Sequence, residues 1–372
     1  MKLTPSDRRK LLPMLDKLAE SVEELLLSGL TTASEATRQA LGVSFQEASR
    51  LGLLRLGSTL RAANEELGRF TRDEAAFSRK RLSFFLNRAW LLSHGLSRAL
   101  KENDEAEFDR LLWTPANNLV ERLEVVTLGV VKRVSAGTFC AFEFRLRTVR
   151  GADNIPEGHR LVWSCVFPLK PGNEIPAEGF LYLPQKQKFS AALFLEGNTI
   201  VIERAAVALD GFGGGRISLG EASTVAAGDP FKDWQRFQSW DTAAAVKRIR
   251  EHKPGPLDLE VEMQEEVVLD DWRIGEPAER AGQQQVVFPI VHGNTTFNAV
   301  VAQGPEGKAL HTALQGLRKK KKTRPPLFGL LHYEMCRLIL QPLAALGKNG
   351  PEQLMLSAEK IDRAALLKAL KF

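Results

Sequence analysis

The sequence predicts a multidomain α+β protein with an N-terminal helical bundle, a central all-β barrel or sandwich, and a small C-terminal α+β module. Three observations predict it. Apolar residues recur at three- and four-residue steps before Pro115, they alternate every second residue after Val120, and strand-like segments flank one helical segment from residue 257 onward. The predicted boundaries are 1–115 for the helical domain, 120–227 for the β-rich domain, 229–254 for a bridging helix, and 257–372 for the last domain.

The helical pattern of the first domain is clear in residues 10–29, which read KLLPMLDKLAESVEELLLSG. One face of that predicted helix carries Leu11, Leu15, Leu18, Val22, Leu25 and Leu26. Gly29 is a typical residue at a helix end. Similar patterns continue to about residue 103, so we expect roughly four helices that pack as a bundle.

The strand pattern of the central domain is clear in residues 139–149, which read FCAFEFRLRTV. Apolar Phe142, Phe144 and Leu146 alternate with Glu143, Arg145 and Arg147. This two-residue period is typical of a half-buried strand. Further short apolar segments, separated by Pro and Gly, predict an all-β barrel or sandwich.

The last domain has a more informative element order. Three predicted strands are followed by a helix over 304–320 and two more strands, which is the order of an OB-type barrel. Other small α+β sheets have the same order, so both interpretations stay open. A closing helix is expected over 357–372. The pattern leaves open whether the two β-rich units share a fold.

Composition and cysteine usage predict a cytoplasmic protein without a membrane partner. The chain has 372 residues and a net charge of +6, and its apolar runs are far shorter than the roughly 20 residues of a membrane span. Cys140, Cys165 and Cys336 are an odd number and lie far apart in sequence. Free thiols in a reducing compartment are the simplest interpretation.

The sequence carries no motif for catalysis, a cofactor or a metal. The glycine-rich segment 211–220, GFGGGRISLG, has Arg216 where phosphate-binding loops need a lysine or a further glycine. The six histidines are scattered, and no nucleophile elbow is present. We therefore expect a protein that is not an enzyme and that needs no cofactor or metal.

One stretch near the C-terminus predicts contact with an anionic partner. Residues 316–333 read GLRKKKKTRPPLFGLLHY, and we call the five cations Arg318, Lys319, Lys320, Lys321 and Lys322 the basic segment. Helix-end cations complement the helix dipole, but that role explains one or two of them. Arg324 adds a sixth charge, and Phe328 and Tyr333 could stack on bases if they face outward. A second cationic group, Arg79, Lys80 and Arg81, stands beside aromatic residues.

These features lead to one hypothesis and an alternative. The first is a non-enzymatic protein that binds an anionic polymer, most plausibly nucleic acid, through the basic segment and Arg324, assisted by residues 79–81. The alternative is a scaffold or adaptor subunit of a cytoplasmic multi-protein complex, which uses its modules to hold other protein subunits. An acidic protein surface is the other partner that the basic segment could meet.

Overall fold

The chain forms two compact units in a computed structural model. The model describes residues 5–30, 35–71, 77–112, 117–135, 139–169, 176–209, 214–251, 257, 264–280, 285–304, 307–320, 324–334 and 337–357. The first unit is Met1–Pro115 with Pro254–Asp258, and the second is Ala116–Lys253 with Leu259–Phe372. The helix expected over 357–372 lies almost entirely outside the described residues.

The first unit is a bundle of helices, as the periodicity predicts. Its described helices are α1 (Pro5–Ser28), α2 (Glu35–Arg50), α3 (Leu54–Thr71), α4 (Arg79–Glu102) and α5 (Glu105–Leu112). Leucines such as Leu11, Leu60 and Leu92 are fully buried in its core. Gly29, with a φ of +81°, supplies the left-handed residue at which α1 ends.

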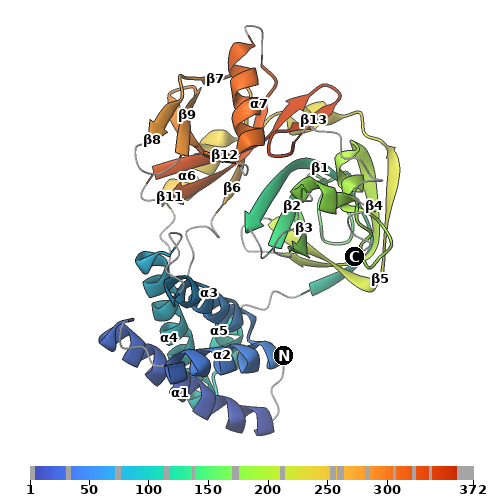
Figure 1. Cartoon of the computed structure of the whole chain (residues 1–372). Coiled ribbons are helices and arrows are strands. Elements are labelled where there is room, and N and C mark those ends of the chain that lie inside the picture. The colour runs from blue at the N-terminus through green and yellow to red at the C-terminus, as the bar shows by residue number, and fades with distance from the viewer. Residues whose placement is uncertain are drawn as a thin grey trace. The chain divides into compact units, whose positions relative to one another are not determined.

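The second unit begins with a closed five-stranded barrel (Figure 1). Its strands are β1 (Asn117–Ser135), β2 (Phe139–Thr148), β3 (Arg160–Pro168), β4 (Asn198–Leu209) and β5 (Gly214–Pro230). The order around the barrel is β1-β2-β3-β5-β4, with β3 and β5 parallel and β4 pairing back to β1. Two short 3-10 helices, η1 (Ala177–Tyr182) and η2 (Ala191–Leu195), lie between β3 and β4. Phe142, Phe144 and Trp163 fill the interior.

A second sheet of the same unit repeats this strand order. Its elements are β6 (Glu265–Leu269), β7 (Trp272–Ile274), β8 (Ala278–Arg280), β9 (Gln285–His292), β10 (Thr295–Ala302), α7 (Lys308–Lys319), β11 (Leu327–Glu334), β12 (Arg337–Gly347) and β13 (Gly350–Gln353). Only Asp270 and Asp271 separate β6 from β7, so the two act as halves of one bent first strand.

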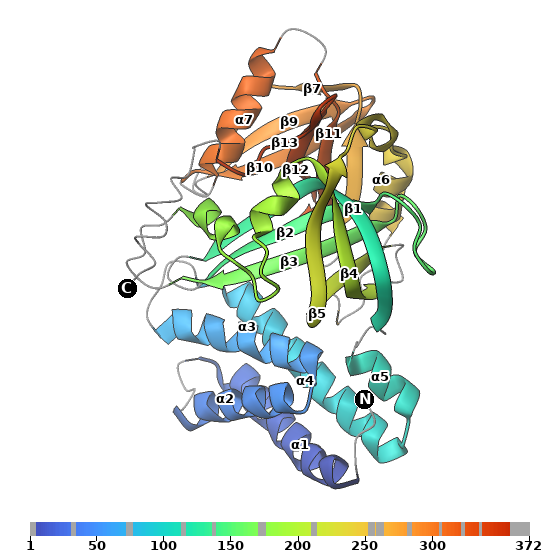
Figure 2. The ribbon, with the colours of Figure 1, turned by 90° about the vertical axis from the view of Figure 1, so that its right-hand side faces the viewer.

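The pairing of this second sheet follows the strand order of an OB-type barrel, and we call it the second barrel. β7 pairs with β9, β9 with β10, β10 in parallel with β12, β12 with β11, and β11 returns to β6. This is the order of the first barrel, with α7 in the place of the two 3-10 helices. The two β-rich units therefore share one topology, a question that the sequence leaves open. Figure 2 shows the strands of both barrels from the side.

The two barrels are joined by a continuous apolar layer. Phe328, Leu330 and Leu343 of the second barrel pack on Val126 and Leu128 of β1. Gly129 makes this contact possible, because an added Cβ there would lie 2.8 Å from both Leu343 Cβ and Phe328 Cδ1. Such a distance is far inside van der Waals contact.

The helix predicted over 229–254 is shorter than expected. β5 continues to Pro230, a 3-10 helix, η3, spans Trp234–Phe237, and α6 spans only Thr242–Glu251. The reason is local, because Asp241 caps α6: its Oδ1 accepts a 2.8 Å hydrogen bond from Ala244 N.

Candidate nucleic-acid interface

Helix α7 positions the start of the basic segment. Leu310, Leu314 and Leu317 form its buried face and pack in the core of the second barrel. The helix ends at Lys319, and Lys320 follows with extended backbone. Both lysine side chains are exposed, whereas Lys321 and Lys322 lie outside the described residues.

Arg324 holds the chain against the barrel after the basic segment. Its Nε donates a 3.1 Å hydrogen bond to Leu317 O, so it satisfies a carbonyl at the end of α7. Its guanidinium lies 5.7 Å from the ring centroid of Trp272 on β7. Trp272 Nε1 in turn donates to Pro325 O at 3.0 Å. Arg324 is thus placed in an intramolecular role, and the segment has a firm attachment on both sides.

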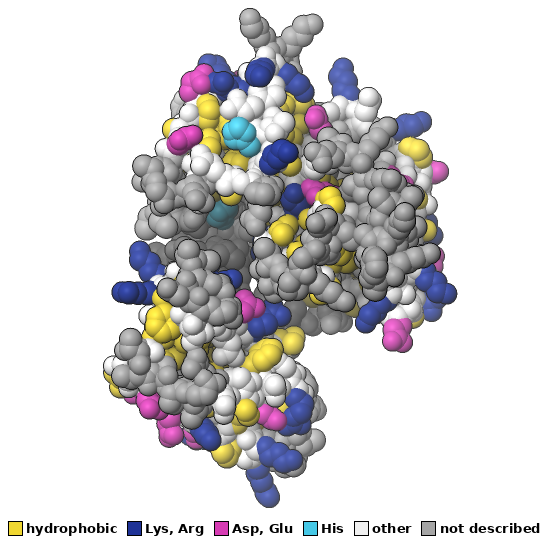
Figure 3. All heavy atoms as spheres, viewed as in Figure 1, with side chains coloured by type: hydrophobic (Ala, Val, Ile, Leu, Met, Phe, Trp, Pro, Cys, Tyr) yellow, Lys and Arg dark blue, Asp and Glu magenta, His cyan; other side chains and the backbone are white. Residues whose placement is uncertain are grey.

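The remaining cations of this region differ in their partners. Arg318 forms an ion pair with Glu276, in the segment that follows β7. Arg273, on β7 itself, is exposed. Figure 3 shows Lys and Arg side chains gathered at the end of the second barrel where α7 terminates. Lys319 and Lys320 are therefore the described members of the basic segment best placed to meet an external anion.

Two aromatic residues near this segment, Phe328 and Tyr333, were predicted to stack on bases if they face outward. Phe328 is fully buried between the barrels, which corrects the expectation that it could stack on a base. The reason is that β11 is apolar on both faces, and the first barrel covers the face that carries Phe328. The side chain of Tyr333 lies outside the described residues, although its backbone pairs with Leu338.

The second predicted cationic group begins α4 in the first unit. Arg79, Lys80 and Arg81 are exposed, and cations at a helix N-terminus are opposed by the helix dipole. Arg81 Nε lies 2.6 Å from Oε1 of Glu66, which is almost fully buried. Glu66 also accepts a 3.1 Å hydrogen bond from Ser78 N. Arg81 therefore has a structural partner, whereas within the described part of the chain neither Arg79 nor Lys80 forms an ion pair.

A cluster of arginines on the first barrel was not predicted from the sequence. Arg145 and Arg147 of β2 and Arg160 of β3 project from the barrel toward the start of β6. Arg147 Nη2 lies 2.5 Å from Glu266 Oε2, and Arg160 Nη1 lies 3.3 Å from Glu265 Oε2. The alternating arginines in EFRLR were a signal that these side chains share one face, but Glu266, with which both pair, lies on another strand far along the chain.

This cluster covers part of one face of the first barrel. OB-type barrels bind oligonucleotides on the face of their second and third strands. In the first barrel, part of that face is closed by Glu265 and Glu266 of the same chain. Burial lowers the pKa of Arg147, whereas the charge of Glu266 opposes that shift. The candidate interface therefore falls on the second barrel.

The described residues offer little support for a metal site or a reactive cysteine. No group of three or more His, Cys, Asp or Glu side chains there could hold a metal ion. Burial raises the pKa of Cys140 to about 11 and that of Cys165 to about 12, which makes both poor nucleophiles. Cys336 lies outside the described residues. Among those residues, no helix is both long and apolar enough to cross a membrane.

Comparisons with known proteins find similarity only among solved structures. No family model and no curated protein matches the chain. A structure of the Ifi202 HINa domain in complex with double-stranded DNA is 13% identical, with a TM-score of 0.28, and the match covers 61% of this chain and 94% of that one. A murine DNA-binding protein bound with double-stranded DNA is 12% identical, with a TM-score of 0.28 and coverage of 65% and 100%.

A third similar structure is a Replication Protein A heterotrimer bound to single-stranded DNA. It is 11% identical, with a TM-score of 0.25, and the match covers 60% of this chain and 49% of that one. Likeness at this level carries no argument about ligands. The assignment of the two barrels rests on their strand pairing.

Proposed function

We propose that this protein is a non-enzymatic binding protein that engages nucleic acid through the basic segment. The observation that carries the proposal is the exposure of Lys319 and Lys320 at the end of α7, beside a sheet with the strand order of an OB-type barrel. Arg324 and Trp272 fix the backbone beside them. Lysines held on a rigid base lose less conformational entropy when they meet a phosphate.

The proposed contacts are to phosphates rather than to bases. The outward positions of β9 and β10 include half-buried aliphatic side chains, Val287, Val291 and Val300, and no described aromatic ring. Base stacking therefore has no platform there. We expect binding that is tolerant of sequence and falls steeply with salt. Lys321 and Lys322 extend the phosphate contacts, and Arg79 and Lys80 assist.

The test is the salt dependence of binding to a short duplex and to a single strand. Replacing Lys319 and Lys320 by Ala should weaken binding and reduce the slope of log K against log salt by about 2, since each phosphate contact contributes about 0.9 on a duplex. A variant with Lys186→Ala and Lys247→Ala removes two other exposed lysines and is the matched control. An unchanged slope in the first variant, or equal loss in both, would contradict the proposal.

The adaptor hypothesis remains the second candidate. Leu119 and Val166 on the first barrel are each 64% exposed, and such side chains can contribute to protein contacts. Isolated exposed apolar residues are common on monomers, so this support is weaker. Co-purification of a fixed protein partner that survives nuclease treatment would favour the adaptor.

A further inference from the structure

A hollow beside the first barrel is lined by charged and aromatic side chains. Its volume is about 260 Å³, and its lining residues are Arg147, Glu157, Gly158, Arg236, Phe237 and Trp240. The first three come from β2 and the turn before β3, and the last three from η3 and the segment after it. Because pockets for drug-sized molecules begin at roughly 300 Å³, a hollow of this volume suits one small ligand.

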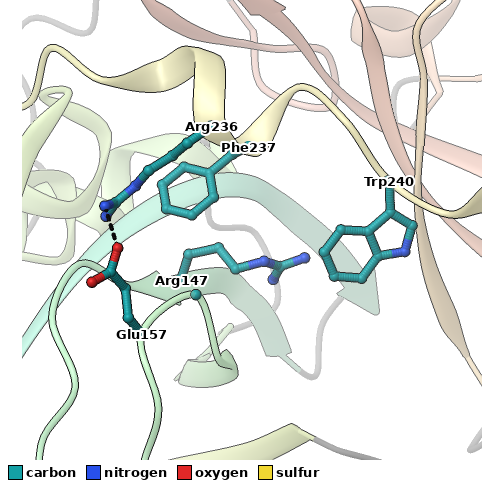
Figure 4. A pocket seen from close by; sticks show the side chains of 6 residues that line it. Arg147, Glu157, Arg236, Phe237 and Trp240 are labelled. Atoms are coloured by element: carbon teal, nitrogen blue, oxygen red, sulfur yellow. Dashed lines mark hydrogen bonds and ion pairs between the residues drawn. The ribbon is translucent and has the colours of Figure 1, made fainter.

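Two arginines in the hollow have donors without acceptors. Figure 4 shows the guanidinium of Arg147 directed toward Trp240 and that of Arg236 directed toward Glu157. The Nε of each is buried and has no hydrogen-bond acceptor among the described residues. Arg147 is only 1% exposed. Its Nη2 pairs with Glu266 and its Nη1 donates to Leu146 O, so Arg147 is held within the protein. Buried donors are nearly always paired in native proteins, so the donor of Arg236 points to an acceptor supplied by a ligand.

Glu157 occupies the place that a ligand anion would take. Its Oε1 accepts a 2.7 Å hydrogen bond from Arg236 Nη1, yet its side chain is 59% exposed. Arg236 is held independently, because its Nη2 donates to Val149 O at 3.0 Å and its guanidinium lies 4.7 Å from the Phe237 ring centroid. An incoming oxyanion can therefore displace Glu157 while Arg236 stays in position.

The aromatic side chains indicate the chemistry of the part of the ligand that is not the anion. Trp240 is half-buried, and the Arg147 guanidinium lies 4.9 Å from its ring centroid. A planar ring can pack against Trp240, since stacking on aromatic side chains accepts any base. Guanidinium groups match phosphate oxygens in geometry and charge. A phosphate joined to a planar base satisfies both parts of the hollow.

We propose that this hollow binds a nucleoside phosphate, with the phosphate at Arg236 and the base against Trp240. The source is either a free mononucleotide or the phosphorylated 5′ end of a strand. The proposal goes beyond polymer binding at the basic segment and does not require it, because none of the lining residues belongs to that segment.

The experiment is calorimetric titration of the full chain with adenosine 5′-monophosphate, adenosine and inorganic phosphate. The monophosphate should bind at least about tenfold more tightly than either part. Trp240→Ala should weaken it by about fivefold or more and leave phosphate binding nearly unchanged, as the usual contribution of stacking implies. Glu157→Gln should strengthen it about twofold to fivefold, because a competing exposed ion pair is removed.

Controls separate this site from general effects. Arg236→Gln should abolish binding, whereas Arg122→Gln removes an exposed, ion-paired arginine of the same barrel and should change nothing. Glu157 is at the surface, so the gain expected for Glu157→Gln tests the proposal even if Arg236→Gln fails to fold. Absence of monophosphate binding, or equal behaviour of the Glu157, Trp240 and Arg122 variants, would overturn it.

Two further arms identify the source and separate the two proposals. An oligonucleotide with a 5′ phosphate that outcompetes its 5′-hydroxyl form indicates a strand end, and equal competition indicates the free nucleotide. Both are measured with Lys319→Ala and Lys320→Ala in place, which removes the proposed polymer contacts. If this variant still binds the monophosphate, the result supports a nucleotide site in the hollow, whatever the outcome for the basic segment. If this variant no longer binds the monophosphate, the proposal of a separate site in the hollow is overturned.

Discussion

The two barrels share one strand order but differ in the segment that joins their third and fourth strands. In the first barrel this segment forms η1 and η2, whose Phe180 and Phe194 are buried in the barrel core. In the second it forms α7, which buries leucines on one side and ends in exposed lysines. The same barrel is thus closed by an apolar plug in one case and by a helix with a cationic end in the other.

The outer faces of the two barrels also differ, in the charge of the side chains that they carry. The arginines of β2 and β3 are committed to Glu265 and Glu266 and hold the barrels together. The corresponding face of β9 and β10 carries mainly uncharged side chains. The difference teaches that positive charge alone does not identify a ligand face, because Arg147 and Arg160 pair with carboxylates of the same chain.

The largest effect is expected where an arginine of the first barrel forms an ion pair with a glutamate of the second. Glu266→Gln removes the partner of buried Arg147 and should lower the free energy of unfolding by about 3–5 kcal/mol. Glu203→Gln is the control, because Glu203 is 47% exposed and its 4.0 Å pair with Arg122 should be worth at most about 1 kcal/mol. Denaturant titration measures both. Similar losses in the two variants would show that the cluster does not hold the barrels together.

A second prediction concerns the apolar layer between the barrels. Gly129→Val would force a side chain against Leu343 and Phe328 and should cost about 1–3 kcal/mol. Gly220→Val is the matched control in the same barrel, since an added Cβ there meets nothing nearer than Ser223 Oγ at 4.0 Å. The thermal midpoint should fall in the first variant only. A Gly129→Val protein as stable as the control would mean that the barrels do not pack closely at β1.

A third prediction separates structural from ligand-facing cations in the second barrel. Arg324→Gln removes a cap of α7 and should lower stability by about 1 kcal/mol, with little change in the salt dependence of nucleic-acid binding. Lys319→Ala with Lys320→Ala should do the reverse. Paired denaturation and binding curves distinguish the roles. If Arg324→Gln reduces the salt slope by about 1 at unchanged stability, Arg324 contacts phosphate instead.

The smallest effect is a pH dependence in the first barrel. Burial raises the pKa of Glu178, but hydrogen bonds from Lys132 and from Ser357 N and the charge of Lys132 leave it below its ordinary value of 4.5. A lowered carboxyl pKa stabilises the fold above pH 4.5, and this stabilisation is lost as pH falls through the folded-state pKa. Stability curves of the native chain and of Glu178→Gln should therefore converge in acid. Parallel curves down to pH 3 would contradict this.

Local patterns were sufficient for much of the fold. The leucine period of residues 10–29, the alternation in 139–149 and the strand–helix–strand order of the last domain all identified the right elements. Each of these signals depends only on which side chains share a face within one helix or strand. The basic segment was found in the same way, and its exposure at Lys319 and Lys320 agrees with the repulsion among its charges.

These patterns did not determine which other elements each face of a helix or strand packs against. Sequence alone determined the helical, barrel and α+β regions, because hydrophobic periodicity is a local property. Only the tertiary structure decided that β3 lies parallel to β5, that Phe328 faces another barrel, and that Arg147 meets Glu266. The physical reason is that these contacts join residues distant in sequence, and their energy depends on burial that no single segment creates.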